Sequence, residues 1–310
     1  MPDAEDDEWG SLVEAAGELG LGSDAVPRVV RRHVVVDGGR RVSIVRWGEA
    51  PPEVVFLHGA GQNARTWDLV ALALGRPALA LDLPGHGRSD WRDDHDYSPA
   101  RNAEAVAIAL TAPFDGMLEP VGPLPLVGMS LGGLTGLRLT VSHPDLVRHL
   151  TVVDITPGGL SRLTAMSREQ RCTVALTDGA EYFDSLEDMV EHAVLASPRR
   201  SANAVRRGVG HNALRLPDGW WRWRHDITGL RTSRLTDRTP LWADVSALRV
   251  PVLLVRGGDS PFVADGDVAA FRQRCPAVRV EVVPGAGHAV QSDRPRELAT
   301  LIDELVLGDR

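Results

Sequence analysis

Six short runs rich in apolar residues alternate with helix-compatible stretches, and this alternation constrains the fold more than any other feature of the sequence. A strand that is buried on both faces reads as a continuous apolar run, and strands separated by helices pair in parallel. The sequence therefore predicts an α/β fold with a mostly parallel central sheet and helices on both faces. The six runs cover residues 54–57, 78–81, 124–127, 150–153, 252–255 and 278–283. The helix-compatible stretches cover residues 64–74, 99–110, 131–142, 264–274 and 294–306.

Two regions depart from this alternation and define the expected domain organisation. Residues 32–36 and 42–47 read as strands joined by the turn Asp37-Gly38-Gly39, which indicates a hairpin. No β-like run is found between residues 156 and 239, and this interval is too long for a loop within a compact domain. We therefore expect an N-terminal arm (1–30), an α/β core (31–155 and 240–310) and an inserted helical cap (156–239). The acidic arm is expected to lie outside the core.

Composition excludes several classes of function. The chain has 34 basic residues and no lysine, so every basic residue is an arginine. Mechanisms that need a lysine amine, such as Schiff-base or pyridoxal phosphate chemistry, are thereby ruled out. A net charge of −8 disfavours nucleic-acid partners, which need a concentrated basic surface. No apolar stretch is long enough for a membrane span and no secretory signal precedes the acidic start, so we expect a cytoplasmic protein without membrane partners.

The most specific motif is Gly128-Met129-Ser130-Leu131-Gly132, which lies between an expected strand and an expected helix. The G-x-S-x-G pattern places a serine on a tight strand-to-helix turn, where a side chain at either glycine would clash with the neighbouring strand and helix. The serine oxygen is then exposed at the edge of the sheet, and the amide that opens the helix can donate to an oxyanion. The motif predicts a nucleophile at Ser130.

Three Gly-rich loops follow expected strands. His58-Gly59-Ala60-Gly61 comes directly after residues 54–57, so a backbone N–H of this turn can point at the reaction centre of the serine. Residues 82–89 form the second loop. The third ends in His288, which alone among the ten histidines stands at a strand end, in a Gly-rich loop and C-terminal to the serine. We therefore expect His288 to be the general base.

These four elements, in this order and spacing, resemble the α/β-hydrolase superfamily over residues 32–306. The resemblance implies a nucleophile–acid–histidine order along the chain, an oxyanion hole and a cap inserted after the sixth strand. It assigns the nucleophile to Ser130, the base to His288 and the oxyanion amides to Ala60 and Leu131, with Gly61 as an alternative. Epoxide hydrolases and haloalkane dehalogenases, which look similar but use an aspartate nucleophile, are excluded by the serine.

The acid of the triad departs from the superfamily pattern. Its usual position, three residues after the glycine that ends the strand at 252–255, is Ser260, and the nearest carboxylate is Asp259. Some members carry the acid at the end of the preceding strand, where this chain has Asp154. Both aspartates lie at carboxyl ends of strands, where open α/β sheets build their sites. We favour Asp154, and Asp259 stays open, as do Asp265 and Asp267.

Aromatic side chains gather in the expected cap, where Trp220, Trp221 and Trp223 stand close together. Such side chains can line the site of an apolar acyl or ring substrate, or they can hold the cap onto the sheet domain, and the two roles are compatible. Further candidates for contact with the substrate lie near the serine motif and the first loop. They are His58, Met129 and Trp67.

Neither a metal nor a cofactor is expected. Residues 93–96 (Asp-Asp-His-Asp) have side chains typical of metal ligands, but consecutive polar residues rarely converge on one ion, so we expect a solvated loop. No G-x-G-x-x-G motif follows the first parallel strand, so a redox cofactor is not implied. The expected partner is a small-molecule substrate.

The expected reaction is hydrolysis of an ester or lactone of a small, largely apolar substrate. Ser130 attacks the carbonyl, His288 accepts the proton, an aspartate fixes the imidazole, and water releases the acyl-enzyme. Thioester hydrolysis, carbon–carbon bond hydrolysis and cofactor-free perhydrolysis stay open because they use the same triad. A non-hydrolytic isomerase, cyclase or ligand-binding protein on the same scaffold is the alternative from another class, since a fold does not fix a function.

Overall fold

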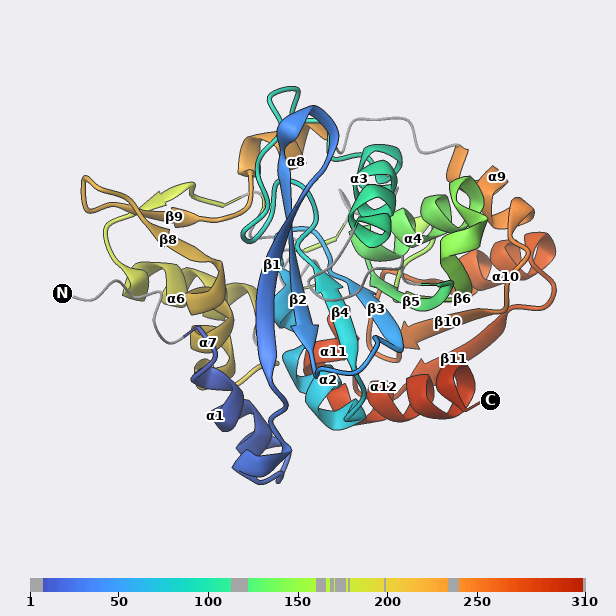
Figure 1. Cartoon of the computed structure of the whole chain (residues 1–310), viewed down its shortest axis with the longest axis horizontal. Coiled ribbons are helices and arrows are strands. Elements are labelled where there is room, and N and C mark those ends of the chain that lie inside the picture. The colour runs from blue at the N-terminus through green and yellow to red at the C-terminus, as the bar shows by residue number, and fades with distance from the viewer. Residues whose placement is uncertain are drawn as a thin grey trace.

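A single large sheet organises the molecule (Figure 1) in the computed structural model, which describes residues 8–112, 122–159, 166–167, 170, 177, 179–197, 199–233 and 240–308. Within these ranges eight strands form this sheet, in the order β1-β2-β4-β3-β5-β6-β10-β11. The pairs from β4 to β11 are parallel, and only the β1–β2 and β2–β4 pairs are antiparallel. The predicted mostly parallel α/β sheet is therefore confirmed. The strands are β1 (Val29–Val35), β2 (Arg41–Trp47), β3 (Val54–Leu57), β4 (Ala78–Leu81), β5 (Leu124–Met129), β6 (Val147–Val153), β10 (Val252–Gly257) and β11 (Arg279–Val283).

The first two strands form the predicted hairpin. Val29 pairs with Trp47 at one end of the hairpin, and Val35 pairs with Arg41 at the other. The connecting turn has Gly38 at φ 64° and Gly39 at φ 80°. Because an L side chain rarely adopts such angles, the two consecutive glycines make this tight return possible.

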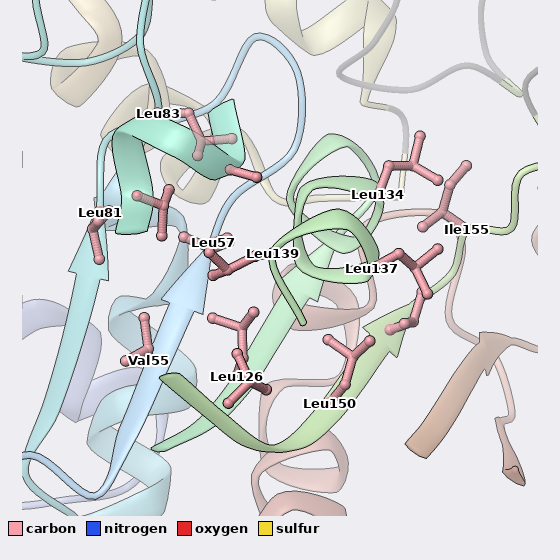
Figure 2. Packing of buried hydrophobic residues seen from close by; sticks show 14 of the residues in the cluster. Val55, Leu57, Leu81, Leu83, Leu126, Leu134, Leu137, Leu139, Leu150 and Ile155 are labelled. Carbon is pink, nitrogen blue, oxygen red and sulfur yellow. The ribbon is translucent and has the colours of Figure 1, made fainter. Parts of the chain in front are cut away.

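Helices cover both faces of the sheet, and the strands bury side chains on both. In β3, Val55 and Leu57 belong to one hydrophobic cluster, shown in Figure 2, whereas Val54 and Phe56 belong to the other. This alternation explains why the strand sequences are continuously apolar. The first cluster includes side chains of α3 (Pro99–Thr111), α4 (Leu131–Ser142), α9 (Pro240–Ala247) and α10 (Asp265–Arg274), and the second includes side chains of α2 (Asp68–Leu74), α11 (Val290–Asp293) and α12 (Pro295–Ile302). Every helix in the described ranges is too short or too polar to cross a membrane.

The N-terminal segment is not detached from the core, in contrast to what its acidic composition suggests. Helix α1 (Ser11–Glu18) buries Leu12, Ala15 and Ala16 in the second cluster, together with Leu19 just after the helix. The carbonyl oxygen of Leu19 also accepts a hydrogen bond from the guanidinium of Arg296, in α12. The expectation of an arm outside the core is therefore wrong for α1, which supplies one of the layers that cover the sheet.

The segment between β6 and α9 carries a small hydrophobic cluster of its own. The helices in its described part are α6 (Leu186–Ala196), α7 (Ala202–Asn212) and α8 (Ile227–Ser233), and the first two pack together. The described part also contains a three-stranded antiparallel sheet in the order β7-β9-β8, formed by β7 (Tyr182–Phe183), β8 (Ala213–Arg215) and β9 (Trp221–Trp223). The expectation of a segment without strands is thus wrong. Strands of two or three residues are too short to show a periodic pattern in sequence.

Candidate active site

Ser130 occupies the sharp turn between β5 and α4. Its backbone has φ 52° and ψ −116°, a conformation that is costly for any residue with a side chain. The Ser130 N–H donates to the carbonyl of Val153 at the end of β6, which holds the turn in place (3.1 Å). A Cβ at Gly128 would overlap the carbonyl of Gly132, and a Cβ at Gly132 would overlap the carbonyl of Leu57 in β3. The predicted reason for both glycines of the motif is therefore confirmed.

His288 joins this serine to a carboxylate. The loop after β11 places its imidazole so that Nε2 lies 3.1 Å from Ser130 Oγ and Nδ1 lies 2.8 Å from Asp154 Oδ2. The ring stacks on Phe262, with centroids 3.4 Å apart and planes 7° apart. All of these side chains are buried. The packing fixes the orientation of the ring, so both of its nitrogens keep their partners.

Asp154 ends β6 and is held by three hydrogen-bond donors. Its Oδ1 accepts from the Gly257 N–H at the end of β10 (2.9 Å), and its Oδ2 accepts from the Ser260 hydroxyl as well as from His288. Its own N–H donates to Val255 (2.7 Å), and its φ of 50° turns the side chain out of the strand direction. These donors satisfy both oxygens of the buried carboxylate.

The other carboxylates that the sequence leaves open do not reach His288. Asp259 lies at the surface and forms an ion pair with Arg199 (2.7 Å). Asp265 pairs with Arg256 (2.5 Å), and Asp267 caps α10 by accepting from the Ala264 N–H (2.8 Å). Of the candidates, Asp154 is the one that the structure brings to the histidine. Ser260 stands at the usual sequence position of the acid, and its hydroxyl contacts the Asp154 carboxylate. That position in the sequence was the signal that could have shown the contact.

The loop after β3 lies directly against the serine turn. A Cβ at Gly59 would come within 2.5 Å of Met129 Sδ and within 3.2 Å of Ser130 Cβ. Within the described residues, neither the Ala60 N–H nor the Leu131 N–H donates a hydrogen bond, and Leu131 opens α4. The carbonyl of Gly61 accepts from the Asn212 amide of α7 (2.8 Å). The two expected oxyanion amides are thus available beside Ser130, and the segment after β6 is tied to the same loop.

Three of the predicted substrate contacts are interior residues. His58 uses both ring nitrogens on backbone groups, since Nδ1 donates to Gly59 (2.8 Å) and Nε2 accepts from the Leu83 N–H (2.9 Å). Burial lowers the pKa of His58, in keeping with this neutral form. Trp67 is fully buried and stacks on Phe56 at 4.8 Å, and Met129 is fully buried as well. The core encloses these side chains, and their contact with a substrate stays a prediction.

The tryptophans after β6 pack rather than line the site. Trp223 is buried between Phe183, at 5.7 Å in an edge-to-face arrangement, and His225, at 5.6 Å. Trp221 packs at the edge of the same cluster, and Trp220 is 45% exposed at the turn between β8 and β9. None of the three lines the cavity beside His288. Of the two roles that the sequence allows, packing is the one that the contacts of Trp223 support.

A cavity of about 430 Å³ opens beside the histidine. His288 and Gly287 form part of its wall, with Arg199 and Arg200 from the segment between α6 and α7 and Asp259 from the loop after β10. A second cavity, of about 90 Å³, lies between α7 and the loop after β3, and its described lining lacks Ser130 and His288. The larger cavity therefore has the volume for a small organic substrate and borders His288, and its described lining also lacks Ser130.

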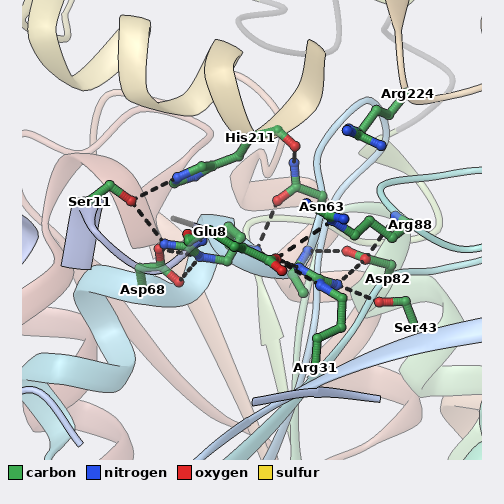
Figure 3. A network of polar contacts seen from close by, with 12 residues as sticks. Glu8, Ser11, Arg31, Ser43, Asn63, Asp68, Asp82, Arg88, His211 and Arg224 are labelled. Carbon is green, nitrogen blue, oxygen red and sulfur yellow. Dashed lines mark hydrogen bonds and ion pairs between the residues drawn. The ribbon is translucent and has the colours of Figure 1, made fainter. Parts of the chain in front are cut away.

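A buried ionic network supports the loops around the site (Figure 3). Asp82 accepts from the Ala64 N–H (2.7 Å) and the Arg88 N–H (3.0 Å) and pairs with Arg31 (2.7 Å). Burial alone would raise the pKa of Asp82, but the Arg31 guanidinium and these amides hold it below its ordinary value. These contacts hold the loop at residues 82–89 against β1 and against the segment after β3, so the loop supports the site.

Residues 93–96 bind one another and the segment after β9. Asp94 pairs with Arg92 (2.9 Å), and His95 Nδ1 lies 2.6 Å from Asp226 Oδ2. The part of the chain that the structure describes contains no group of three or more His, Cys, Asp or Glu side chains that could hold a metal ion. The contacts of Asp94 and His95 are those of a loop that joins neighbouring segments.

Comparisons with known proteins match nearly the whole chain. A model described as "Alpha/beta hydrolase family" matches residues 54–301. The chain is 46% identical over 297 residues to the esterase Rv0045c of Mycobacterium tuberculosis (strain ATCC 25618 / H37Rv), covering 96% of this chain and 94% of that protein. A solved structure of the M. tuberculosis esterase superposes with a TM-score of 0.82 at 44% identity and covers 97% of this chain and 98% of that one. The chain is also 29% identical over 258 residues to the sn-1-specific diacylglycerol lipase ABHD11 of Mus musculus, covering 79% of this chain and 78% of that protein.

Proposed function

The chain belongs to the alpha/beta hydrolase family and is a carboxylic-ester hydrolase, and we propose that Ser130, His288 and Asp154 are its catalytic triad. The observation that carries this proposal is the unbroken series of contacts from Ser130 Oγ through the imidazole to Asp154 Oδ2, at 3.1 and 2.8 Å. The order of the three residues along the chain, serine, aspartate, histidine, also fits this family of hydrolases.

The mechanism follows from these contacts. Asp154 accepts a hydrogen bond from the Nδ1–H of His288, which leaves the Nε2 lone pair facing the Ser130 hydroxyl. Nε2 takes the hydroxyl proton as Ser130 Oγ attacks the ester carbonyl, and the imidazolium then protonates the leaving alcohol. A water molecule, activated by the same nitrogen, attacks the acyl-enzyme and releases the acid. Asp154 keeps its negative charge throughout and stabilises the imidazolium.

We assign the oxyanion hole to the N–H groups of Ala60 and Leu131. One amide comes from the loop after β3 and the other from the first turn of α4, where a helix N-terminus favours developing negative charge. Gly59 permits the close approach of the two segments, since a Cβ there would meet Met129 and Ser130. Gly61 is the alternative donor from the same loop, and its carbonyl accepts from the Asn212 amide.

We further propose that the segment with α6 and α7 acts as a cap, and that the substrate is a small-molecule ester or lactone held in the cavity of about 430 Å³. Arg199 and Arg200 bring this segment to the wall that also contains His288. Thioesters and other substrates of the same triad fit the mechanism equally well. A non-hydrolytic role is disfavoured, because a ligand-binding protein has no need of a strained serine in contact with a histidine–carboxylate pair.

The test is release of nitrophenolate from p-nitrophenyl butyrate by the wild type and by Ser130→Ala. Loss of the nucleophile should lower kcat on the order of 10⁶-fold, to the level of the residual background. Ser142→Ala is the matched control, since this exposed serine stands at the other end of α4 and donates only to Arg138. A fluorophosphonate probe should label the wild type and the control at Ser130. Equal turnover by Ser130→Ala and wild type would refute the proposed mechanism.

A further inference from the structure

We propose that Arg199 is a specificity residue that binds a carboxylate carried by the substrate, so that the enzyme prefers anionic esters over neutral ones of similar length. The inference rests on the proposed function and adds a substrate class to it. Arg199 at present pairs with Asp259 (2.7 Å), and both side chains line the cavity beside His288. The substrate carboxylate would take the place of Asp259 on the guanidinium.

The position of Arg199 gives it access to a bound ester. The residue precedes α7, and its side chain crosses the cavity wall toward the loop that carries the histidine. Its Cδ lies 3.6 Å from the point where a Cβ on Gly287 would stand, and Gly287 is the residue before His288. The Arg199 side chain therefore lies beside the residue that precedes the proposed base, and both Arg199 and His288 line the same cavity.

The ion pair is of a kind that can exchange partners at low cost. Arg199 and Asp259 keep 50% and 47% of their side-chain surface exposed. Exposed pairs contribute about 0–1 kcal/mol, and a displaced Asp259 would regain its hydration. A guanidinium can hold a carboxylate through two parallel N–H donors, so the incoming group is bound at least as well as the one it replaces. Arg200 is less suited, because its Nη2 donates to the Ala204 carbonyl (3.3 Å).

The charge distribution of the cap favours an anionic substrate. Residues 156–239 contain thirteen arginines and ten aspartates or glutamates, in a chain whose net charge is −8. Asp293 also lines the cavity, and burial raises the pKa of its carboxyl group. Positive charge near a site raises the local concentration of anionic substrates and speeds their association.

The experiment compares mono-p-nitrophenyl adipate, which carries a free carboxylate, with p-nitrophenyl hexanoate, which does not. The readout is the ratio of kcat/KM for the two esters after subtraction of the rate with Ser130→Ala. The wild type should favour the adipate by about fivefold to tenfold, mainly through KM, and added salt should reduce this ratio. Arg199→Gln should bring the ratio to about one. Asp259→Asn should raise the ratio above that of the wild type, because it removes the competing carboxylate.

The matched control is Arg206→Gln. Arg206 is an exposed arginine of the same cap segment whose partner is Glu187, and it is absent from the described lining of the cavity. This variant should keep the wild-type ratio. If the Arg199–Asp259 pair only clamped the cap, Arg199→Gln and Asp259→Asn would change the ratio in the same direction or leave it at the wild-type value, and either result would overturn the inference. Release of no nitrophenolate from either ester would contradict the proposed hydrolase mechanism itself, and the inference with it.

Discussion

Removal of the Ser260 hydroxyl tests how the catalytic acid is held. Its Oγ donates to Asp154 Oδ2, the oxygen that also contacts His288 Nδ1. A hydrogen bond to an ionised group contributes about 1.5–3 kcal/mol. Because the Gly257 N–H and the imidazole remain as donors to Asp154, we assign about half of this free energy to stabilisation of the transition state. Ser260→Ala should therefore lower kcat about fourfold to twelvefold.

The same substitution has a separable effect on stability. Ser260 Oγ also accepts from the Phe262 N–H (3.2 Å), and Phe262 stacks on the imidazole. Loss of this acceptor should cost about 1 kcal/mol of unfolding free energy, measured by urea denaturation. Ser260→Thr keeps the hydroxyl and serves as the control, with kcat close to that of the wild type. If Ser260→Ala turned over p-nitrophenyl butyrate at the wild-type kcat, the role assigned to this hydroxyl would be refuted.

A relocation of the acid extends the test. Asp154→Asn should reduce kcat about 10⁴-fold, the loss known for such a change in a serine protease. Ser260 stands beside the carboxylate oxygen that faces the histidine, so an aspartate introduced there should reach the same nitrogen. The double variant Asp154→Asn/Ser260→Asp should recover at least about tenfold in kcat over Asp154→Asn alone. A double variant no faster than the single one would show that the two positions do not share this space.

Three further outcomes follow from the packing and the charges. Trp67→Ala should lower the free energy of unfolding, measured in urea, by about 3–5 kcal/mol, because Trp67 is buried. Trp220→Ala should change this free energy by less than about 0.5 kcal/mol, because Trp220 is exposed. Similar losses for the two variants would contradict the burial of Trp67. Gly59→Ala should reduce kcat at least about tenfold without a matching loss of Tm, because the added methyl displaces the serine turn. Arg31 holds the pKa of Asp82 below its ordinary value, so this carboxylate stabilises the fold above the unfolded pKa of about 4 and loses that effect as pH falls through the lower folded pKa. Asp82→Asn should therefore be less stable than wild type at neutral pH, with the difference in Tm shrinking at acidic pH; a difference that does not depend on pH would refute this account.

The sequence was most informative where local geometry decides the outcome. The glycines around Ser130 are required by contacts with the turn itself and with β3, and the motif records that requirement directly. The choice between Asp154 and Asp259 could not be made locally, since both follow strands of the sheet. It depends on the direction in which each side chain leaves its strand and on Arg199, which binds Asp259 from 60 residues away.

Other differences between the sequence predictions and the structure have equally specific causes. Trp67 lies between a loop and a helix, and nothing in its neighbourhood in sequence shows that Phe56 covers it. Helix α1 is different, because its sequence does carry the spacing of a buried helix. Leu12, Ala15, Ala16 and Leu19 have the i, i+3, i+4, i+7 spacing of a buried helical face, and the acidic residues around them concealed it.

The contact between α1 and α12 has a consequence for how the chain reaches this structure. The bond from Arg296 to the Leu19 carbonyl joins residues 277 apart, and both helices belong to the cluster beneath the sheet. Contacts of such large sequence separation close late, and they slow folding. During synthesis α1 and α2 lack the side chains of α12 that complete their cluster until α12 has left the ribosome, so part of their apolar surface is exposed to other chains until then. The period of greatest aggregation risk therefore ends only when the last helix docks.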